Sequence, residues 1–444
     1  DYRNQYINRL NQNLKLSAGI SYNWTFRNIS LQPEYNYAYS YIKTDNPLYR
    51  LDKISGRDSS LFDRLPSATS ILATVLDNGN TYHFTEYQNS HQFNFCYRDL
   101  HSKLLNCEIS VNLPVRIAHA NLYYQRMGRH DVSRQSIFFE PNIWLRGNAW
   151  EIKAKMNSEL PDLTTMVNYR DDSNPMNIIL GNMQLRNIHY YDIEGGKTFE
   201  GKKHSRLNIN TGYHQTDNAV AYSLVFDKQT GVSTVQPISV NGNYRIDLGI
   251  GYTRPLDKKE KLSIDNQASF NYNHNVDMAM VQGATQSQRS IVNNWKISNV
   301  LKLNYRLDDN YEFTLHGGGT YYLIKSQREG FSNIHAGDYN IGMNAQITLP
   351  WKLQLTTDLT MFARRGYQLS EMNTTDWIWN AQLSRSFINK KLLVKLQGFD
   401  ILRQLSNTQY LMNAQGRTET WNNSIPRYMM LSLSWRFNVN PKKK

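Results

Sequence analysis

The sequence predicts an all-β protein, a transmembrane antiparallel β-barrel of which about 17 strands are visible. Three observations predict it: long stretches in which apolar and polar residues alternate, connections that alternate between short and long, and an aromatic-rich composition. The chain of 444 residues contains 29 Tyr, 9 Trp and 16 Phe. Strands favour aromatic and β-branched residues, whereas helices favour Ala, Leu, Glu and Lys.

The alternation has a period of two and extends over long segments. It runs through residues 14–27 and resumes in residues 29–41, after a tight turn at Arg27-Asn28. Such segments exceed the usual five or six residues of a globular strand and fit tilted membrane-spanning strands. The predicted strands are residues 13–26, 29–43, 83–98, 103–126, 134–146, 149–158, 183–194, 203–227, 237–254, 259–275, 291–307, 310–326, 336–349, 352–365, 375–388, 391–404 and 426–438.

The connections between these segments alternate in length. The short ones are residues 27–28, 147–148, 307–310, 350–351 and 389–390, and the long ones are 44–82, 159–182, 276–290, 327–335, 366–374 and 405–425. Outer-membrane barrels have short periplasmic turns and long extracellular loops. Propellers, β-helices and sandwiches also contain strands with alternating apolar and polar residues, but these strands are shorter. Propellers and β-helices also have a regular sequence repeat. The low mean hydropathy of −0.62 fits a barrel, because only every second residue meets lipid.

The number and direction of the strands suggest an incomplete barrel. If the last strand ends in the periplasm, the first predicted strand begins outside the cell, whereas a complete barrel has an even strand number. We therefore expect residues 1–444 to be one barrel domain, the C-terminal portion of a barrel of about 22 strands. This count depends on residues 203–227 forming one strand, kinked through Gln215–Asn218.

Charge and cysteine content exclude some functions. The net charge is +13, but apart from Lys442–Lys444 the basic residues are spread along the chain. A dispersed charge suits anionic lipid headgroups or an anionic cargo better than nucleic acid, which we do not expect as a partner. Cys96 shares a face with polar residues and Cys107 with apolar ones, so we predict two free thiols.

Three stretches resemble a known family: "ELPDLTTMVNYRDDSNPMNIILGNMQL" at 159–185, "NAQLSRSFINKKLLVKLQGFDILRQ" at 380–404 and "IPRYMMLSLSWRFN" at 425–438. They are similar to motifs of the Bacteroidota-type outer-membrane β-barrel family, which is related to TonB-dependent transporters. Met183 stands where the family usually has Pro. The matching residues of the first motif are Pro161, Leu163, Asp172, Ser173, Asn174, Pro175, Gly181, Asn182 and Leu185.

The resemblance implies an outer-membrane transporter that takes up a nutrient. Members of the family resemble a barrel of about 22 strands closed by an N-terminal plug, and no part of this chain reads as the plug. The implied partners are outer-membrane lipid and lipopolysaccharide, a plug domain, a TonB-type energy-coupling protein and a surface lipoprotein. The alternative is a non-transporting structural or assembly subunit of a larger outer-membrane complex.

No arrangement of residues indicates catalysis, a cofactor or a metal. The histidines have no metal-ligand spacing, and we expect His91, His101 and His119 to lie in the lumen or in turns. Asp162, Asp171 and Asp172 could bind Ca²⁺ or could belong to a solvated loop. The glycines at 317–319 lie within a predicted strand, where they would relieve curvature or crowding.

Aromatic residues form the remaining candidate sites. Two membrane-interface belts are expected at the strand ends, formed by Trp24, Phe26, Trp351, Trp435 and Phe437 on the periplasmic side and by Tyr37, Tyr39 and Tyr41 on the outer side. A second group near the long loops could stack on a sugar or peptide ligand, or could serve as girdle and loop packing: Tyr367, Trp377, Trp379, Tyr410 and Trp421.

Overall fold

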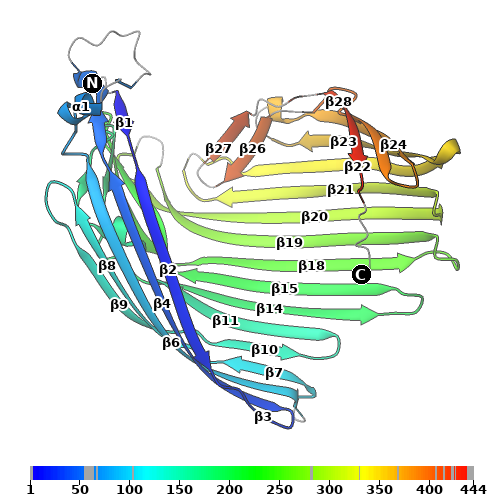
Figure 1. Ribbon diagram of the computed structural model, residues 1–444, viewed down its shortest axis with the longest axis horizontal. Coiled ribbons are helices and arrows are strands. Elements are labelled where there is room, and N and C mark those ends of the chain that lie inside the picture. Colours follow the sequence, from blue (N-terminus) through cyan, green and yellow to red (C-terminus); the bar gives the residue numbers. More distant parts are fainter. Residues whose placement is uncertain are drawn as a thin grey trace, which may run out of the picture.

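One large antiparallel sheet dominates the computed structural model of the protein (Figure 1). The structure describes residues 4–54, 65–66, 69–102, 105–280, 284–329, 331–367, 370–405, 408–413, 416–421, 425 and 427–437. No helix in these ranges is long and apolar enough to cross a membrane. The helical segments are short: η1 (Leu51–Lys53), α1 (Thr69–Thr74), η3 (Leu163–Met166), η4 (Pro350–Lys352) and η5 (Ser370–Met372).

Twenty strands make up the large sheet. They are β2 (Leu10–Ser21), β3 (Trp24–Phe26), β4 (Ile29–Asn46), β6 (Tyr82–Ser102), β7 (Cys107–Asn112), β8 (Val115–Gln125), β9 (Val132–Phe139), β10 (Asn142–Arg146), β11 (Trp150–Glu159), β14 (Ile188–Glu200), β15 (Arg206–Asp217), β18 (Asn243–Pro255), β19 (Leu262–Ala279), β20 (Gln288–Asp308), β21 (Tyr311–Ser326), β22 (Ile334–Leu349), β23 (Leu353–Arg365), β24 (Thr375–Phe387), β25 (Leu392–Phe399) and β28 (Tyr428–Trp435).

Three pairs of these strands are single spanning segments with one interruption: β2 with β3, β7 with β8, and β9 with β10. The register with the neighbouring segment is the same on both sides of each interruption. Pro114 and Pro141 stand at two of the interruptions, because proline has no N–H to donate to the ladder. Counting each pair once reduces the twenty strands to seventeen segments, which confirms the predicted number.

Segments that follow one another along the chain are neighbours in the sheet, and their connections alternate in length as expected. One end of the sheet has the short turns 27–28, 103–106, 147–149, 201–205, 256–261, 309–310, 350–352 and 388–391. The other end has 47–81, 126–131, 160–187, 218–242, 280–287, 327–333, 366–374 and 400–427. The connection 126–131 is shorter than the others at its end.

The prediction of one kinked strand over residues 203–227 is wrong. β15 ends at Asp217, and β16 (Ala219–Phe226) leaves the large sheet to pair with β17 (Ser233–Val240). Asn218 has a φ of 57° and Gly242, on the opposite arm of the hairpin, has a φ of 106°. Left-handed backbone at both positions bends the hairpin out of the sheet. The number of spanning segments is unaffected, because both strands of the hairpin, β16 and β17, lie outside the large sheet.

The two faces of the sheet differ in polarity. On β4, the tyrosines at 35, 37, 39 and 41 share a face with Phe93 and Tyr87 of β6, and the Tyr41 and Tyr87 ring centroids are 5.2 Å apart. The opposite face pairs Asn36 with Gln92 and Ser40 with Gln88. We call these the apolar face and the polar face. In a membrane barrel the apolar face meets lipid and the polar face lines the lumen.

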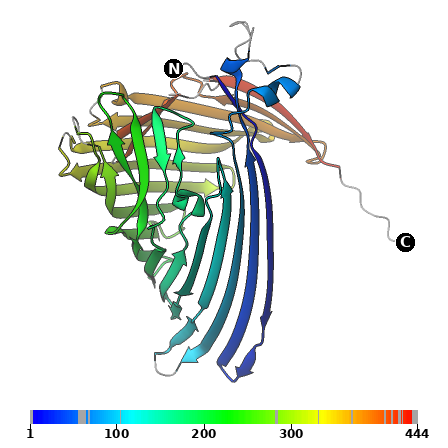
Figure 2. The same ribbon diagram turned by 90° about the vertical axis from the view of Figure 1, so that its left-hand side faces the viewer.

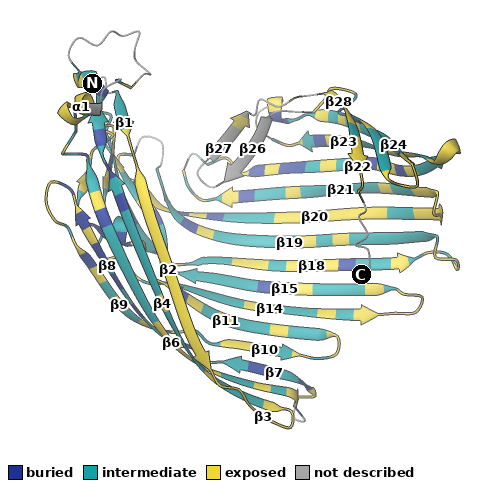
Figure 3. Ribbon diagram, in the orientation of Figure 1, coloured by how far each residue is buried: buried dark blue, intermediate teal, exposed yellow. Residues whose placement is uncertain are grey.

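Two strands form the edges of the sheet among the residues that the structure describes. β2 pairs with β4 alone and β28 with β25 alone. β2 is exposed along its whole length (Figure 3). β2 belongs to the first and β28 to the last of seventeen consecutive antiparallel segments, so the two strands run in the same direction.

Cys96 and Cys107 are both free, as predicted. Cys96 lies opposite Asn112 and Cys107 lies opposite Ser102, so the two thiols do not face each other across the ladder.

Two of the three glycines at 317–319 relieve crowding: a Cβ would be tight at Gly318 and Gly319 but would have room at Gly317. A Cβ at Gly319 would lie 2.9 Å from the ring of Tyr339, and a Cβ at Gly337 would lie 2.3 Å from its hydroxyl. The Tyr339 ring therefore lies across two glycine positions of neighbouring strands.

Candidate ligand pocket

Residues 160–187, here called the mouth loop, fold back over the polar face of the barrel wall. Its buried side chains Leu163, Met166, Val167 and Leu185 pack on the loop ends of β6, β8 and β9, where the polar-face positions are apolar. The partners on the wall are Phe84, Ala120, Leu122, Tyr124 and Val132, of which Ala120 and Leu122 are completely buried. The loop is thus attached by a hydrophobic core, which is the main force that can hold it there.

A small sheet joins the mouth loop to the bent hairpin. Its order is β12 (Arg170–Asp171), β13 (Asn177–Leu180), β17 and β16, with β13 parallel to β17. In Figure 2 its green strands stand beside the blue and teal strands of the wall. The hairpin tip also bonds to residues 284–287, through Phe226 N–H to Thr285 O and Ser287 N–H to Leu224 O, both at 2.7 Å. We call this unit the mouth sheet.

The family-motif residues hold the mouth loop in shape. A Cβ at Gly181 would lie 1.8 Å from the carbonyl oxygen of Val167, so a side chain there has no room. Asn182 donates from Nδ2 to Pro237 O at 2.9 Å and accepts from Gln184 N–H at 2.9 Å. Asn174, which precedes Pro175, accepts from Met176 N–H at 3.1 Å, and Asp172 lies in the same turn. These contacts are internal to the mouth, and their role in any activity stays a prediction.

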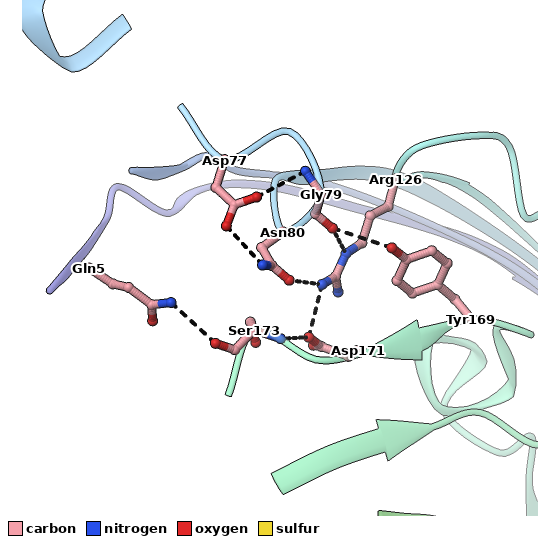
Figure 4. A network of polar contacts seen from close by, with 8 residues as sticks. All are labelled: Gln5, Asp77, Gly79, Asn80, Arg126, Tyr169, Asp171 and Ser173. Carbon is pink, nitrogen blue, oxygen red and sulfur yellow. Dashed lines mark hydrogen bonds and ion pairs between the residues drawn. The ribbon is translucent and has the colours of Figure 1, made fainter. Parts of the chain in front are cut away.

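Arg126, at the end of β8, anchors the mouth loop to the neighbouring connection (Figure 4). Its side chain is 1% exposed. The guanidinium donates to Gly79 O at 2.8 Å and to the side-chain oxygen Oδ1 of Asn80, and it pairs with Asp171 Oδ1 at 3.0 Å. It also lies 4.6 Å from the centre of the Tyr169 ring. One buried cation therefore joins three segments that are far apart in the sequence.

Asp171 is held in its ionised form by this arrangement. Burial alone would favour the neutral acid, but hydrogen bonds from Arg126 and from Ser173 outweigh it and hold the pKa of Asp171 below its usual 3.8. The Ser173 carbonyl oxygen in turn accepts from the Gln5 amide at 3.2 Å, which brings the start of the described chain into the same network. Of the three predicted Ca²⁺ candidates, Asp171 is thus an ion-pair partner.

A cavity of about 670 Å³ lies between the mouth loop and the polar face. Five rings line it: Tyr82, Phe84, Tyr124, Tyr169 and Tyr222. The ring centroids of Tyr82 and Tyr124 are 5.6 Å apart and nearly parallel. The charged lining residues are Arg9, Glu86, Asp162 and Asp171. Volume and lining are those of a small-molecule site, with apolar walls and few polar groups.

The sequence points to Pro161, Asp162, Leu163, Asp171 and Gly181 for other reasons, but it predicts no pocket here and none of the five rings that line it. A signal was present in β8, where Ala118, Ala120, Leu122 and Tyr124 occupy four successive positions of the polar face, which is mostly hydrophilic elsewhere in the barrel. Apolar residues on both faces of a strand end indicate that another segment covers the inner one. Which segment covers it depends on contacts between residues far apart in the chain.

The predicted interface aromatics lie at strand ends or on the apolar face. Trp24 and Phe26 precede a short turn, and Trp351 lies within another with 80% of its surface exposed. The Trp435 and Phe437 rings lie 6.2 Å apart at the end of β28. Tyr37, Tyr39 and Tyr41 lie along the apolar face of β4. Contact with the membrane interface remains a prediction for all eight residues.

Of the five predicted ligand-contact aromatics, the three whose side chains the structure describes are not brought together. Trp377 and Trp379 lie opposite Met361 and Leu359 on the apolar face. Tyr367 packs against a small core and donates to Asp338 Oδ1 at 2.9 Å. Burial and the Asp338 carboxylate raise the pKa of Tyr367. The side chains of Tyr410 and Trp421 lie outside the described residues. Ligand contact remains a prediction for this group.

Two of the three histidine placements are wrong. His91 and His119 lie on the apolar face, where His91 Nδ1 is 2.8 Å from the Tyr35 hydroxyl. The register shows this placement, because His91 lies opposite Tyr37 of β4 and His119 lies opposite Asn89 of β6. In the part of the chain that the structure describes, no three His, Cys, Asp or Glu side chains are placed to hold a metal ion.

Comparison with known proteins identifies the class. Residues 285–435 match the family model described as "Outer membrane protein beta-barrel family". The chain is an outer-membrane β-barrel protein. No curated protein matches the sequence of this barrel.

Two solved structures resemble the barrel. The structure of the RagAB peptide transporter matches with a TM-score of 0.42 and 9% identity, covering 90% of this chain and 58% of that one. The FrpB iron transporter from Neisseria meningitidis (F3-3 variant) matches with a TM-score of 0.30 and 11% identity, covering 89% of this chain and 69% of that one. The barrel thus spans little more than half the length of the first structure.

Proposed function

We propose that residues 1–444 form the barrel wall of a TonB-dependent receptor-like transporter that takes up a nutrient across the outer membrane. The observation that carries the proposal is the cavity of about 670 Å³ on the polar face, at the end of the sheet that has the long loops. A ring-lined cavity at the mouth of a lumen is suited to capture a small molecule before it passes inward.

The proposal implies partners that transport requires. A plug domain would close the lumen, a TonB-type protein would couple transport to energy, and a surface lipoprotein would assist capture. The polar face supports a lumen occupant, because its side chains offer donors and acceptors, such as Asn380, which donates to Asp358 at 2.9 Å. Lipid and lipopolysaccharide would contact the apolar face.

The test is uptake by cells of the native host with and without the full-length protein. Labelled candidate nutrients are offered singly, and uptake is measured with and without a protonophore. We expect the loss of the protein to abolish uptake of one class of compound, and the protonophore to have the same effect. Unchanged uptake of every class, with the protein recovered in a stable complex, would favour the alternative role as a structural or assembly subunit.

A further inference from the structure

The charged residues that line the pocket are mostly acidic, although the whole chain carries a net charge of +13. Three carboxylates, Glu86, Asp162 and Asp171, and one cation, Arg9, line the cavity. The ion pair with Arg126 compensates the charge of Asp171. Glu86 and Asp162 form no ion pair among the described residues, and with Arg9 they leave this lining one net negative charge.

Glu86 is a polar-face residue of β6, lies opposite Leu122 and is half-buried. Among the described residues it has no hydrogen-bond or ion-pair partner, and the negative charge of Asp162 acts on it. Asp162 Oδ1 accepts from the backbone N–H of Thr164 at 2.9 Å and from its hydroxyl at 2.8 Å. Two like charges beside an apolar wall repel each other, and a cation placed near them would remove that repulsion.

The rings provide the second half of the site. Phe84 adjoins both Tyr82 and Tyr124, with centroid distances of 6.3 Å and 6.5 Å, so the three rings form a triangle. Tyr169 adjoins Tyr124 at 6.4 Å, and Tyr222 is a half-exposed lining residue from the mouth sheet. Aromatic faces attract cations and also bury the apolar part of a ligand. The acidic pair and the rings line one cavity, so one ligand can meet both.

We propose that the pocket binds a ligand with a protonated amine or guanidinium group on an apolar or aromatic body. The carboxylates of Glu86 and Asp162 take the cationic group, and the rings contact the body. The proposal rests on the proposed function in one respect: it makes this class of compound the transported nutrient. Glu86 is the residue that decides charge selectivity, since among the residues described it has neither an ion pair nor a hydrogen bond.

The test uses two probes of the same shape and opposite charge, 2-phenylethylamine and 3-phenylpropionate. Each is titrated at pH 7 into the full-length protein, purified in detergent from the outer membrane, and binding is measured by calorimetry. We expect the amine to bind at least ten times more tightly than the acid. Equal affinity of the two probes, or no binding of the amine, would overturn the proposal.

A matched pair of variants locates the site. Glu86→Gln keeps the shape of the side chain and removes its charge, so we expect amine affinity to fall about tenfold. Glu108→Gln is the control, because Glu108 is another acid on the polar face, paired with Arg98 at 3.3 Å and absent from the lining. An equal loss of affinity in both variants would contradict the assignment. Heat modifiability on a denaturing gel checks that each variant barrel is folded.

The two proposals fail in different ways. If the amine binds through Glu86 but no cell takes up amines or any other nutrient through the protein, the site stands and the transport function fails. If uptake of a nutrient depends on the protein but the purified protein does not bind the amine, transport stands and the ligand class is wrong.

Discussion

The polar face serves two different purposes in the two halves of the barrel. At the loop ends of β6, β8 and β9 it is a packing surface, where Phe84, Leu122 and Val132 are buried beneath the mouth loop. In the C-terminal half it carries cross-strand hydrogen bonds between polar side chains, such as Thr314 to Asn304 at 2.9 Å and Gln397 to Gln382 at 2.8 Å. The same period-two pattern therefore supports both a covered and a water-facing wall.

The connections account for this difference. The loop 160–187 buries its own apolar side chains against the wall, whereas the connections 280–287 and 327–333 are too short to do so, and the equally long connection 400–427 is described only in part. A small core does exist in the C-terminal half, but it contains four buried residues, Val292, Ile324, Ile334 and Ala336. Substitutions should therefore have larger effects at the mouth than at matched positions elsewhere.

Arg126→Met should have the largest effect. It leaves the Asp171 carboxylate, Asn80 and Gly79 O without their shared donor, which we expect to cost about 4 kcal/mol. The free energy of unfolding is measured by denaturant titration of the full-length protein in detergent. Arg129→Met is the control, because Arg129 is 69% exposed beside Asp131, and we expect a change below about 1 kcal/mol. Equal losses would mean that the Arg126 network does not hold the mouth together.

Leu122→Ala tests the hydrophobic attachment of the mouth loop. The residue is completely buried, so the cavity left behind should cost about 3 kcal/mol. Val300→Ala is the comparison in the C-terminal half, on the same face but 37% exposed, where we expect about 1 kcal/mol or less. The comparison between the two halves would be wrong if Val300→Ala were the more damaging change.

Gly181→Ala should distort the turn of the mouth loop. The added methyl group would meet the Val167 carbonyl oxygen at 1.8 Å, and we expect a loss of about 2 kcal/mol. Gly249→Ala introduces the same methyl group into a strand where no atom lies within 4 Å, and should be neutral or slightly stabilising. Limited trypsin digestion reads out the loop itself, and only the Gly181 variant should be cut faster within 160–187.

The smallest effect is that of pH. Because the pKa of Asp171 is held below its usual 3.8, its ion pair contributes stability above that value and loses it as the pH falls further. Pepsin cleavage of the mouth loop should accelerate as the pH falls from about 4 to about 2. Asp171→Asn should remove this acceleration, after correction for the activity of pepsin on an unfolded substrate. The same pH dependence in both proteins would contradict the account.

The strands were predictable from the sequence because the alternation of apolar and polar residues is a local signal. In residues 14–26 the alternation alone shows which side chains lie on the apolar face, and no other segment has to be considered. The mouth was not predictable, because its structure depends on interactions between distant parts of the chain, such as the burial of Leu185 and Leu122 in one cluster and the ion pair of Arg126 with Asp171. The bend at Asn218 was missed for a related reason, since its matching position, Gly242, lies across the hairpin.

The central claim is that the mouth loop is folded against the polar face. Hydrogen exchange of the full-length protein in detergent, read by mass spectrometry, tests it most directly. The amides of Tyr169, Asn182 and Leu185, which bond to Val167, Thr165 and Asn182, should exchange far more slowly than an unstructured loop, and Arg126→Met should release them. Rapid exchange of all three amides in the unmodified protein would contradict the account.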